Sequence, residues 1–318
     1  MTNEILVSIL CMTYNHENYI KDTLEGFINQ KTDFKYEIIV NDDASSDKTP
    51  QILKNYENKY SHFFFPIYQV ENQYSKGVDI VVDILLPKAR GKYIAFCEGD
   101  DYWIDEYKLQ KQVNALETNL EVDGCVHRVK VVSEKNGTDI RFCAPENMDT
   151  IIPTSKVISE GGGYIGTCSI MYRKEVASYR FAFEDVINFD YTYQIKMSLK
   201  GGVIYLNDCM GVYRINTIGS WSSIITKDSE KAKIHLNKVL NMLIQLDQDT
   251  GNKYDFAIKC AIGRAYMEYF LREGRVLAVL KKEYYQYFKL LNLRVRIGYY
   301  KSATIIKIKR ILGRLGFI

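Results

Sequence analysis

Apolar and polar positions alternate in blocks through the first hundred residues of the chain. Short apolar runs are separated by longer stretches that have the spacing of amphipathic helices. The apolar runs cover residues 5–12, 36–41, 63–69 and 92–96, and the helical stretches cover residues 17–29, 49–60 and 78–89. Near-continuous apolar strands between amphipathic helices are typical of a parallel sheet that is covered on both faces. The pattern therefore predicts an α/β fold with a mostly parallel sheet flanked by helices.

The pattern changes twice further along the chain. We expect a helix over residues 109–118, a strand over 124–132, a helix near 191–200 and two short strands at 203–206 and 211–215. After about residue 227, apolar positions recur at helical spacing to the end of the sequence. The sequence therefore predicts two parts, an α/β domain over residues 1–226 and a helical extension over residues 227–318.

Three polar clusters follow the first, second and fourth predicted strands. They read TYNHEN at residues 13–18, NDDASSDKT at residues 41–49 and CEGDDYW at residues 97–103. In open parallel sheets, ligands bind outside the carboxyl ends of the strands. We therefore expect the three clusters to converge in space at one edge of the sheet.

The third cluster brings three carboxylates, Glu98, Asp100 and Asp101, into one turn. Like charges this close raise each other's pKa, so such a turn usually faces a compensating positive charge. A divalent metal is the commonest such charge, and Mg²⁺ and Mn²⁺ prefer oxygen ligands and keep coordination positions open for phosphate oxygens. The alternative is an acidic turn that is simply solvated.

In the second cluster, Asp42 and Asp43 stand at the exit of a predicted buried strand. Ser45 and Asp47 are suited to cap the following helix, but capping does not account for both earlier carboxylates. A carboxylate at a strand end can accept hydrogen bonds from the imide N–H of a base or from ribose hydroxyls. The pair therefore favours a nucleoside site, and the alternative is a turn with a helix cap.

The composition bounds the classes of function. With 318 residues, 47% of them hydrophobic, the chain can bury a full core. A net charge of +3 is too small to predict a nucleic-acid partner. Seven cysteines without a CxxC pair indicate reduced thiols, and no apolar segment reaches the roughly 18 residues of a spanning helix. With no signal-like start, the expected location is the cytoplasm.

Four segments together resemble glycosyltransferase family 2, whose enzymes have the GT-A fold and transfer a sugar from a nucleotide donor with inversion. The segments are VSILCMTYNHENYIKDTLEGFINQ, YEIIVNDDASSDKT, GKYIAFCEGDDYW and FDYTYQIKMSLKGGVIYLNDCMGVYRIN. Their order and spacing are similar to those of the family over about the first 220 residues. The resemblance implies a Rossmann-like GT-A sheet with a nucleotide-sugar site at its edge.

The resemblance assigns the nucleotide to the first two clusters. In the family, the tip of the first strand and the aspartates after the second strand hold the base and the ribose. The matching residues of this chain are Thr13, Tyr14, Asn15, Asp42 and Asp43. Asp43 is expected nearest the base, and Tyr14 has an alternative role as a buried aromatic that closes the end of the sheet.

The family's metal motif, Asp-x-Asp or a variant, maps onto the acidic turn. Asp101 and Glu98 are the expected metal ligands, with Asp100 on the nucleotide side. Glu98 stands where Asp is commoner. The implied cofactor is Mn²⁺ or Mg²⁺, which neutralises the charge that grows on the leaving diphosphate. Trp103 is suited to line the donor sugar, with plain packing as the alternative.

An inverting transfer needs a base, because the acceptor hydroxyl loses its proton as it attacks the anomeric carbon. The family uses Asp or Glu for this step. Asp190, at the start of the predicted helix before KGGVIYL, matches the family's position, and Glu184 and Asp185 are the other candidates. A further alternative is that Asp190 only stabilises the first turn of its helix.

Two later segments contribute to the expected donor or acceptor pocket. Gly162 and Gly163 lie in a glycine run that either lets backbone approach a ligand or serves as a flexible connector. The segment YRINTIGSWS resembles a family segment that ends in Tyr-Arg-x-His before a loop over the diphosphate. Arg214 and Trp221 are expected contacts there, with a structural ion pair as the alternative for Arg214. Asn216 stands at the position of the usual His.

These features lead to one leading hypothesis. The chain would be an inverting, metal-dependent glycosyltransferase that moves a sugar from a nucleotide donor, expected to be a UDP-sugar, to a saccharide or lipid-linked acceptor in polysaccharide or glycolipid synthesis. One alternative is a binding or scaffold protein that kept the fold and lost turnover. Another is a nucleotidyltransferase that makes the nucleotide sugar, but TYNHEN lacks the Gly-rich, basic phosphate loop usual for that chemistry.

Residues 294–318 contain several basic residues and no acidic one. On a helical wheel, Lys307, Arg310 and Arg314 share one side, and Lys309 sits near the apolar edge. The opposite side carries four apolar residues, Ile305, Ile308, Leu312 and Leu315. This pattern predicts an interfacial helix on an anionic membrane surface, at the inner face of the cell membrane. The alternative is a terminal helix that packs on the protein's own core.

Overall fold

The computed structural model describes residues 4–133, 138–187, 190–217 and 228–314. The chain forms two compact units. The first unit comprises Met1–Thr154, Gly162–Arg180 and Tyr193–Ser220, and the second comprises Ser155–Gly161, Phe181–Thr192 and Trp221–Ile318. Two segments that precede residue 227 thus belong to the second unit, and the boundary of domains at that residue stays a prediction.

The first unit is built on one curled sheet. Its strands are β1 (Ile5–Thr13), β2 (Lys35–Asp42), β3 (Phe64–Tyr68), β4 (Tyr93–Phe96), β5 (Tyr102–Trp103), β6 (Gly124–Ser133), β7 (Thr138–Cys143), β8 (Thr150–Ile152), β9 (Met171–Arg173) and β10 (Val203–Ile215). They follow the order β3-β2-β1-β4-β9-β6-β10-β5, with β7 beside β6 and β8 beside β10. The first four strands of this order pair in parallel, and so do β6 and β10.

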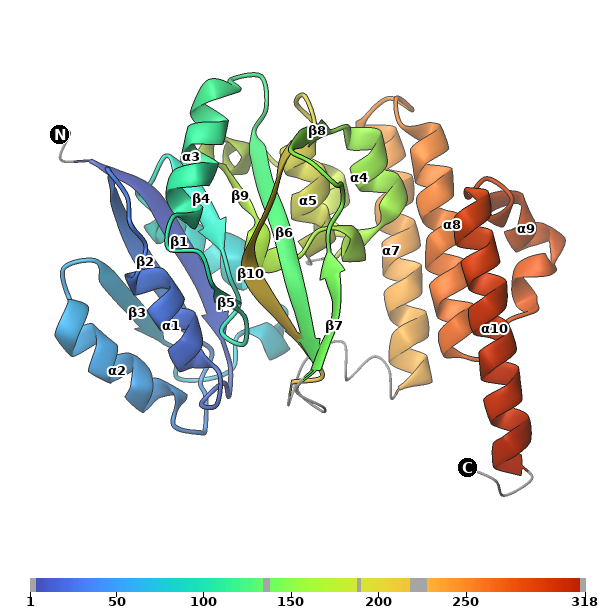
Figure 1. Cartoon of the computed structure of the whole chain (residues 1–318), viewed down its shortest axis with the longest axis horizontal. Coiled ribbons are helices and arrows are strands. Elements are labelled where there is room, and N and C mark those ends of the chain that lie inside the picture. Colours follow the sequence, from blue (N-terminus) through green and yellow to red (C-terminus); the bar gives the residue numbers. More distant parts are fainter. Residues whose placement is uncertain (1–3, 134–137, 188–189, 218–227, 315–318) are drawn as a thin grey trace. The chain divides into compact units, whose positions relative to one another are not determined.

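Helices flank the sheet of the first unit and form most of the second. The longer ones are α1 (Ile20–Ile28), α2 (Thr49–Tyr60), α3 (Lys108–Thr118), α4 (Thr154–Glu160), α5 (Asp190–Ser198), α7 (Ser229–Asp249), α8 (Asp255–Arg272), α9 (Lys282–Phe288) and α10 (Leu293–Arg314). The short ones are η1 (Tyr74–Lys76), η2 (Ile80–Leu85), η3 (Leu86–Lys88), η4 (Gly162–Tyr164), η5 (Thr167–Ser169), η6 (Lys174–Ser178), η7 (Ala182–Asp185) and η8 (Ala278–Leu280). Figure 1 shows α1 and α3 crossing one side of the strands. The predicted α/β class is confirmed.

Residues 78–89 differ from the predicted amphipathic helix. They form the π-helix η2 followed by the 3-10 helix η3, and Pro87 lies within η3. Proline has no backbone N–H and clashes with the preceding turn, so a regular α-helix cannot run through this position. Asp79 begins the segment, because its carboxylate accepts hydrogen bonds from the amides of Val81 and Val82, both at 3.0 Å.

The two strands predicted at residues 203–206 and 211–215 are one strand, β10. The polar stretch between them has the composition of a turn, but β6 is long enough to pair with both halves. The register of this pairing shifts at Cys209, where the strand absorbs the irregularity as a bulge. Tertiary pairing therefore overrides the local signal for a turn.

The core of the first unit forms where α1 packs on the central strands. Val7 and Ile9 of β1 and Val40 of β2 are fully buried. Phe27 of α1 is also fully buried, and its ring lies 4.7 Å from the ring of Trp103. This packing fixes β5, through Trp103, against α1, and so helps to hold the acidic turn that directly precedes β5.

The second unit has a core of its own between α8, α9 and α10. Phe270, Phe288 and Tyr299 are buried there, and the ring of Phe288 lies 5.4 Å from that of Tyr299. The hydroxyl of Tyr299 donates a hydrogen bond to the carbonyl of Val276 at 2.7 Å. The first turns of α10 are thus packed on the rest of the second unit.

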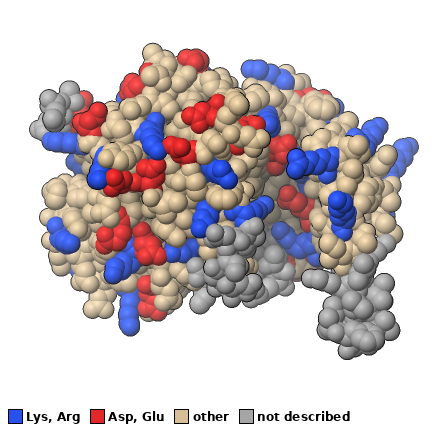
Figure 2. Space-filling model, in the orientation of Figure 1, with Lys and Arg blue, Asp and Glu red and all other residues tan. Residues whose placement is uncertain are grey.

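Charged side chains of both signs are mixed on the surface of the molecule that Figure 2 shows. On the face shown in Figure 2, Lys and Arg side chains are interspersed with Asp and Glu side chains, so the small positive net charge is not gathered there. Among the residues that the structure describes, no helix combines the length and apolar character needed to cross a bilayer.

Three strand ends carry non-glycine residues with positive φ. Asn15 follows β1 with φ 56°, Ala44 follows β2 with φ 62° and Asn216 follows β10 with φ 62°. The left-handed region brings Cβ close to the next carbonyl oxygen, and Asn tolerates it better than Ala does. These residues turn the chain sharply at the strand ends, at some cost in stability.

We expect Ala44→Gly to stabilise the protein by up to about 1 kcal/mol, because glycine adopts positive φ without steric cost and this gain exceeds its larger unfolded-state entropy. Thermal unfolding would measure the change. Ala115→Gly, inside α3, is the matched control and should instead lower stability by roughly 0.5–1 kcal/mol. A loss of stability of equal size in both variants would contradict the strain at Ala44.

Candidate active site

The three polar clusters meet at the carboxyl edge of the sheet, as predicted. The amide of Asp43 donates to the carbonyl of Thr13 at 3.0 Å, which joins the loops after β2 and β1. The amide of Gly99 donates to the carbonyl of Met12 at 2.8 Å, which joins the turn after β4 to the same place. Parallel strands end at one edge, so their loops share this region.

The loops after β1 and β2 hold each other through reciprocal hydrogen bonds. The amide of Asn15 donates to the hydroxyl of Ser45, and the amide of Ser46 donates to Oδ1 of Asn15, both at 2.8 Å. The amide of Glu17 donates to the carboxylate of Asp47 at 2.9 Å. The side chain of Asn15 thus supports loop geometry, and its contact with a nucleotide stays a prediction.

The two aspartates after β2 have different partners. Asp42 is buried, accepts a hydrogen bond from the hydroxyl of Ser45, and has a pKa raised above its ordinary value by burial. Asp43 accepts hydrogen bonds from the amide of Gln73 at 2.8 Å and from the amide of Tyr74 at 3.1 Å. Each carboxylate oxygen has a second lone pair, so Asp43 keeps acceptor capacity for a base. Sequence reasoning did not predict a role for Gln73 and Tyr74, because their contact with Asp43 joins separate loops.

The tip of β1 presents one exposed and one buried side chain. Tyr14 is 47% exposed, so it is not the buried aromatic of the alternative interpretation. Thr13 is 3% exposed, and its buried hydroxyl has no hydrogen-bond partner among the described residues. A Cβ on Gly99 would lie 2.6 Å from that hydroxyl oxygen, so the approach of the two loops requires glycine there.

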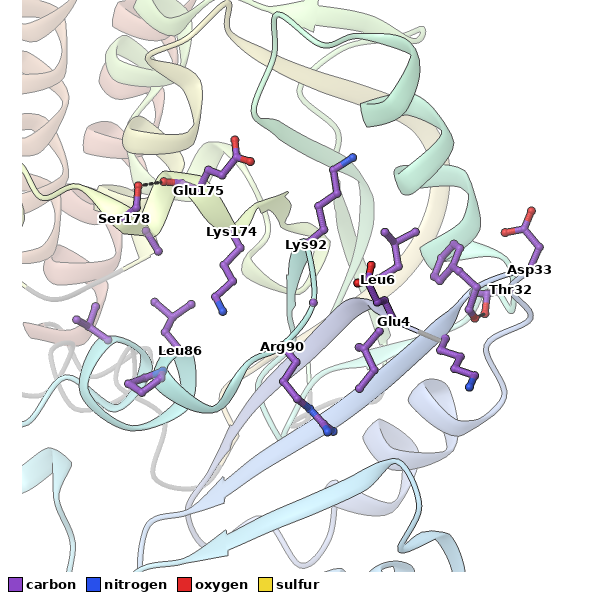
Figure 3. A pocket seen from close by; sticks show the side chains of 17 residues that line it. Glu4, Leu6, Thr32, Asp33, Leu86, Arg90, Lys92, Lys174, Glu175 and Ser178 are labelled. Atoms are coloured by element: carbon purple, nitrogen blue, oxygen red, sulfur yellow. Dashed lines mark hydrogen bonds between the residues drawn. The ribbon is translucent and has the colours of Figure 1, made fainter. Parts of the chain in front are cut away.

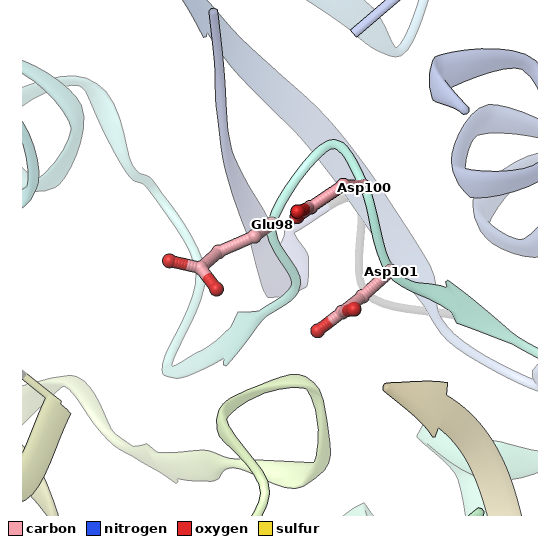
Figure 4. A group of neighbouring side chains, drawn as sticks. All are labelled: Glu98, Asp100 and Asp101. Atoms are coloured by element: carbon pink, nitrogen blue, oxygen red, sulfur yellow. The ribbon is translucent and has the colours of Figure 1, made fainter. Parts of the chain in front are cut away.

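The acidic turn gathers its three carboxylates closely. Figure 4 shows Glu98, Asp100 and Asp101 on one turn after β4, and one carboxylate oxygen of each lies within 4.8 Å of the other two. Asp101 is fully buried, and Oδ1 accepts a hydrogen bond from the amide of Arg214 at 2.8 Å. Burial, and then the charges of Asp100 and Glu98, raise the pKa of Asp101 well above its ordinary value.

The donor set of this turn fits a hard divalent cation. Oδ2 of Asp101 is buried without a hydrogen-bond partner among the described residues, in a protein where buried polar atoms are normally paired. Carboxylate oxygens are ligands that Mg²⁺ and Mn²⁺ prefer. A cation held by Asp101 and Glu98 would satisfy this oxygen and offset the mutual repulsion that raises the pKa of Asp101.

Arg214 connects the end of β10 to the acidic turn. Its guanidinium donates to the backbone carbonyl of Asp100 at 2.9 Å and forms an ion pair with Asp22 at 2.5 Å. The same group lies over the ring of Tyr102, 4.3 Å from its centroid. The structural ion pair that was the alternative for Arg214 is present, and a contact with the donor stays a prediction.

The residues after Arg214 continue this connection. The hydroxyl of Thr217 donates to Oδ2 of Asp100 at 2.9 Å. Asn216, which stands where the family has His, donates from its side chain to the hydroxyl of Ser133 at 3.3 Å. The sequence did not single out Thr217, because a lone threonine in a polar loop has no local signature. Trp221 lies outside the described residues.

The remaining residues predicted for the donor or acceptor pocket are Trp103, which is buried, and two glycines of a loop. Trp103 is 4% exposed and its indole N–H donates to the carbonyl of Cys168 at 2.8 Å, as the packing alternative expects. Its role at the donor sugar stays a prediction. The carbonyl of Gly162 accepts a hydrogen bond from Gln194 at 3.2 Å, and a Cβ on Gly163 would meet open space. The glycines are therefore compatible with a ligand beside them.

The candidate bases belong to the second unit. Asp190 is the first residue of α5 and is half-buried. Glu184 is buried, and its carboxylate accepts a hydrogen bond from the amide of Phe181 at 2.7 Å, whereas Asp185 is exposed. A carboxylate engaged with its own backbone is less available to an acceptor hydroxyl, which counts against Glu184. The role of Asp190 as the base stays a prediction.

A separate hollow of about 1230 Å³ lies at the amino-terminal ends of β1 and β4, away from the carboxylates (Figure 3). Leu6 and Arg90 are among the residues that line it. Arg90 pairs with Glu37, and the ammonium of Lys174 donates to the carbonyl of Ala89 at 2.5 Å. Because these cations are engaged in structural contacts, we place the site at the carboxyl edge.

Relatives in sequence identify the family of the chain. The profile of Glycosyl transferase family 2 matches residues 8–181. An uncharacterized protein of Mycobacterium tuberculosis is 36% identical over 220 residues, which are 69% of this chain and 62% of that protein, so the chain spans under two thirds of its length. The putative teichuronic acid biosynthesis glycosyltransferase TuaG of Bacillus subtilis is 28% identical over 233 residues, covering 69% of this chain and 84% of TuaG.

Solved structures share the fold. Staphylococcus aureus TarS 1–349, in complex with UDP-GlcNAc, has a TM-score of 0.58 at 19% identity and covers 96% of this chain and 92% of its own. The mannosyltransferase PcManGT from Pyrobaculum calidifontis, in complex with GDP-Man and Mn²⁺, has a TM-score of 0.52 at 15% identity and covers 96% and 87%. The family profile extends over more than half of the chain, which therefore belongs to glycosyltransferase family 2 and has the GT-A fold.

Proposed function

We propose that the protein is an inverting, metal-dependent glycosyltransferase that moves a hexosyl or N-acetylhexosaminyl group from a nucleotide sugar to a saccharide or lipid-linked acceptor. One observation carries the proposal. A buried oxygen of Asp101, which has no hydrogen-bond partner in the part of the chain that the structure describes, lies in an acidic turn at the same sheet edge as Asp42 and Asp43. A site for a divalent cation thus adjoins a site suited to a nucleoside.

The nucleoside would bind against the tips of β1 and β2. Tyr14 is exposed there and can cover a base or ribose with its ring. Thr13 offers a buried hydroxyl without a partner among the described residues, and Asp43 keeps acceptor capacity for an imide N–H. Asp42 and Asn15 fix these loops through Ser45 and Ser46.

The diphosphate would lie at the acidic turn. Asp101 and Glu98 would hold Mn²⁺ or Mg²⁺, and Asp100 would face the nucleotide. When bound, the cation would neutralise the negative charge that develops on the leaving diphosphate. The burial of Asp101 excludes water from this side of the turn, which strengthens electrostatic interactions there.

Asp190 would act as the general base. Its carboxylate would accept the proton of the acceptor hydroxyl as that oxygen attacks the anomeric carbon on the face opposite the leaving nucleotide. Attack from that face inverts the configuration at the anomeric carbon. The first-turn position of Asp190 also lets the helix dipole stabilise the ionised form that a base requires.

Named relatives support the substrate classes. TarS is solved with UDP-GlcNAc and PcManGT with GDP-Man and Mn²⁺, so nucleotide-sugar donors and a divalent cation occur on this fold. TuaG is named for teichuronic acid biosynthesis, which favours an acceptor in polysaccharide synthesis. We favour a UDP-sugar as donor. Incubating the protein and Mn²⁺ with UDP- and GDP-sugars, and detecting released nucleotide and glycosylated product, tests the proposal. Binding without turnover of any donor would instead favour a catalytically silent binding protein.

The first turns of α10 combine a packed face with an exposed apolar face. Tyr299 and Ala303 are 2% and 7% exposed and pack within the second unit. Leu293, Ile297 and Tyr300, spaced as neighbours on the other side of the helix, are 64%, 45% and 43% exposed. The helix therefore both packs on its unit and presents apolar side chains to solvent.

We propose that this exposed face rests on an anionic membrane surface, where a lipid-linked acceptor would be found. Arg294 and Lys301 are exposed on the same helix and suited to meet anionic headgroups. Four further basic side chains expected to contribute, those of Lys307, Lys309, Arg310 and Arg314, lie outside the described side chains. Exposed apolar side chains between cations are typical of an interfacial helix.

Asp101→Asn should raise the stability of the metal-free protein at neutral pH. The pKa of Asp101 is raised in the folded state, so the folded protein binds the proton more tightly than the unfolded chain does. The free energy of unfolding therefore falls as the pH rises from the ordinary pKa of a carboxyl group to the raised pKa of Asp101. The variant removes this loss, which is about 1.4 kcal/mol for each unit of pKa shift. Thermal unfolding in chelator across this pH range measures the difference.

The same variant should lose the stabilisation that Mn²⁺ confers. For a cation present at about 100 times its Kd, binding to the folded state adds roughly 2.7 kcal/mol. Asp22→Asn, on the exposed partner of Arg214, leaves all three carboxylates of the turn in place and should keep most of this effect. Equal stabilisation of wild type and Asp101→Asn by Mn²⁺ would rule out Asp101 as a ligand.

Asp190→Asn should lower kcat by about 10²–10⁴-fold while leaving donor affinity nearly unchanged, because loss of a general base acts on the chemical step. Single-turnover kinetics and nucleotide-sugar titration measure the two effects separately. Asp185→Asn is the exposed control and should retain activity. Activity that survives in Asp190→Asn but disappears in Asp185→Asn would transfer the role to Asp185.

Replacing Leu293 and Ile297 together by Gln should reduce binding to anionic vesicles by roughly tenfold or more, because two apolar side chains no longer enter the interface. Sedimentation with vesicles of phosphatidylglycerol and phosphatidylcholine, at low and high salt, measures it. Phe256→Gln, at a 66% exposed position on α8, is the control. Equal recovery of wild type and the double variant in the lipid pellet would reject this surface, and absence of both would reject membrane binding.

A further inference from the structure

The three carboxylates of the acidic turn need contacts that hold them close together. Three carboxylates whose oxygens approach within 4.8 Å repel one another, and exposed side chains would rotate apart. Thr23 braces the backbone of the turn, because its hydroxyl lies 3.0 Å from the carbonyl oxygen of Gly99 and 2.6 Å from that of Asp101. Backbone bracing alone leaves the carboxylates free to choose other rotamers, so contacts to the side chains must hold them.

Two such contacts come from the end of β10 and from the residues directly after it. The amide of Arg214 donates to Oδ1 of Asp101 at 2.8 Å, and the hydroxyl of Thr217 donates to Oδ2 of Asp100 at 2.9 Å. Thr217 is 1% exposed, so water does not compete easily for this bond. Asn216, with φ 62°, turns the backbone between the two donors.

The position of β10 relative to the turn is itself fixed. β10 pairs with β5, which follows the acidic turn directly, and the register places Gly211 opposite Trp103 and Val212 opposite Tyr102. The backbone pairing of β10 with β5 therefore lies only a few residues from the donors Arg214 and Thr217 and from the acceptors Asp101 and Asp100. This makes the end of β10 a rigid support for the carboxylates.

Arg214 supports the turn while its guanidinium pairs elsewhere. The guanidinium donates to the backbone carbonyl of Asp100 and forms an ion pair with Asp22, outside the acidic turn. Asp22 thus offsets much of the positive charge of Arg214. The turn keeps its negative charge, and the buried oxygen of Asp101 keeps its need for a partner.

We propose that Thr217 is a positioning residue for the metal site, because its hydroxyl holds the Asp100 carboxylate beside the place where Asp101 and Glu98 would bind the cation, and the negative charge of Asp100 there strengthens cation binding. The inference rests on the proposed metal-dependent function. Thr217 touches neither the donor nor the cation in this role. Thr217 raises metal affinity because it orients the Asp100 carboxylate before the metal ion binds, so binding does not have to supply the free energy of that ordering.

The test compares two substitutions at one position. Thr217→Val removes the hydroxyl but keeps the shape, and Thr217→Ser keeps the hydroxyl. We expect Thr217→Val to bind Mn²⁺ roughly tenfold more weakly, as for loss of a hydrogen bond to a charged group, and Thr217→Ser to bind within about twofold of wild type. Isothermal titration of the full chain with Mn²⁺, without donor, measures affinity independently of activity.

Thr154→Val controls for the general loss of a buried hydroxyl. Thr154 is 7% exposed and its hydroxyl donates to the carbonyl of Ser198, remote from the acidic turn in sequence. This variant should lose stability without losing Mn²⁺ affinity, whereas Thr217→Val should lose affinity even at temperatures where it is fully folded. A purely structural role for Thr217 predicts the same behaviour for both variants.

The outcomes separate this inference from the proposed function. If wild type binds Mn²⁺ and Thr217→Val binds it equally well, the positioning role is wrong while the metal site stands. If Thr217→Ser is as weak as Thr217→Val, the hydroxyl is not the cause and the inference is again wrong. If wild type binds neither Mn²⁺ nor Mg²⁺, both the metal-dependent function and the role of Thr217 are overturned.

Discussion

Parallel pairing of β1 with β2 and β4 is the constraint on which the candidate site depends. The register places Thr13 opposite Asp42, so β1 and β2 end at the same level, and it places Phe96 opposite Leu10, so β4 ends slightly earlier and the turn after it runs on beside the end of β1. Their loops must then share one small volume, and backbone hydrogen bonds such as that from Asp43 to Thr13 hold them there. A register slip of one residue would turn these side chains to the other face of the sheet. The site is thus built by strand pairing before any side chain contributes chemistry.

Bringing charged and sharply turned segments together has a cost. Asp101 is a fully buried carboxylate with a raised pKa, and Asn15, Ala44 and Asn216 hold positive φ around it. Strained residues and buried charges each lower stability by roughly 1–3 kcal/mol, and they persist only where the surrounding structure fixes them. Their concentration at the carboxyl edge distinguishes that edge from the hollow at the amino-terminal ends of the strands. These physical features make the carboxyl edge the candidate binding site.

The distribution of charge at this edge favours a cation that comes from solution. Arg214 reaches the acidic turn with its backbone amide and with a guanidinium that pairs with Asp22. The Arg214 amide and the Thr217 hydroxyl thus hold Asp101 and Asp100 by hydrogen bonds. In the proposed reaction, Asp101 and Glu98 would bind a metal ion, and this ion would neutralise the negative charge that develops on the diphosphate. Stability is given up in the free protein, and binding of the cation would restore it.

The sequence by itself determined several elements of the first hundred residues and the place where their polar clusters meet. Alternating apolar and amphipathic blocks predicted β1, β2, α2 and β4 closely, because their buried faces follow local periodicity. The convergence of the polar clusters also followed, since parallel strands end at one edge. Only the tertiary structure decided that β10 is continuous, that Trp103 is buried, that backbone amides bind Asp43 and that Thr217 holds Asp100. These contacts join segments far apart in the chain, and long-range pairing leaves no trace in local spacing.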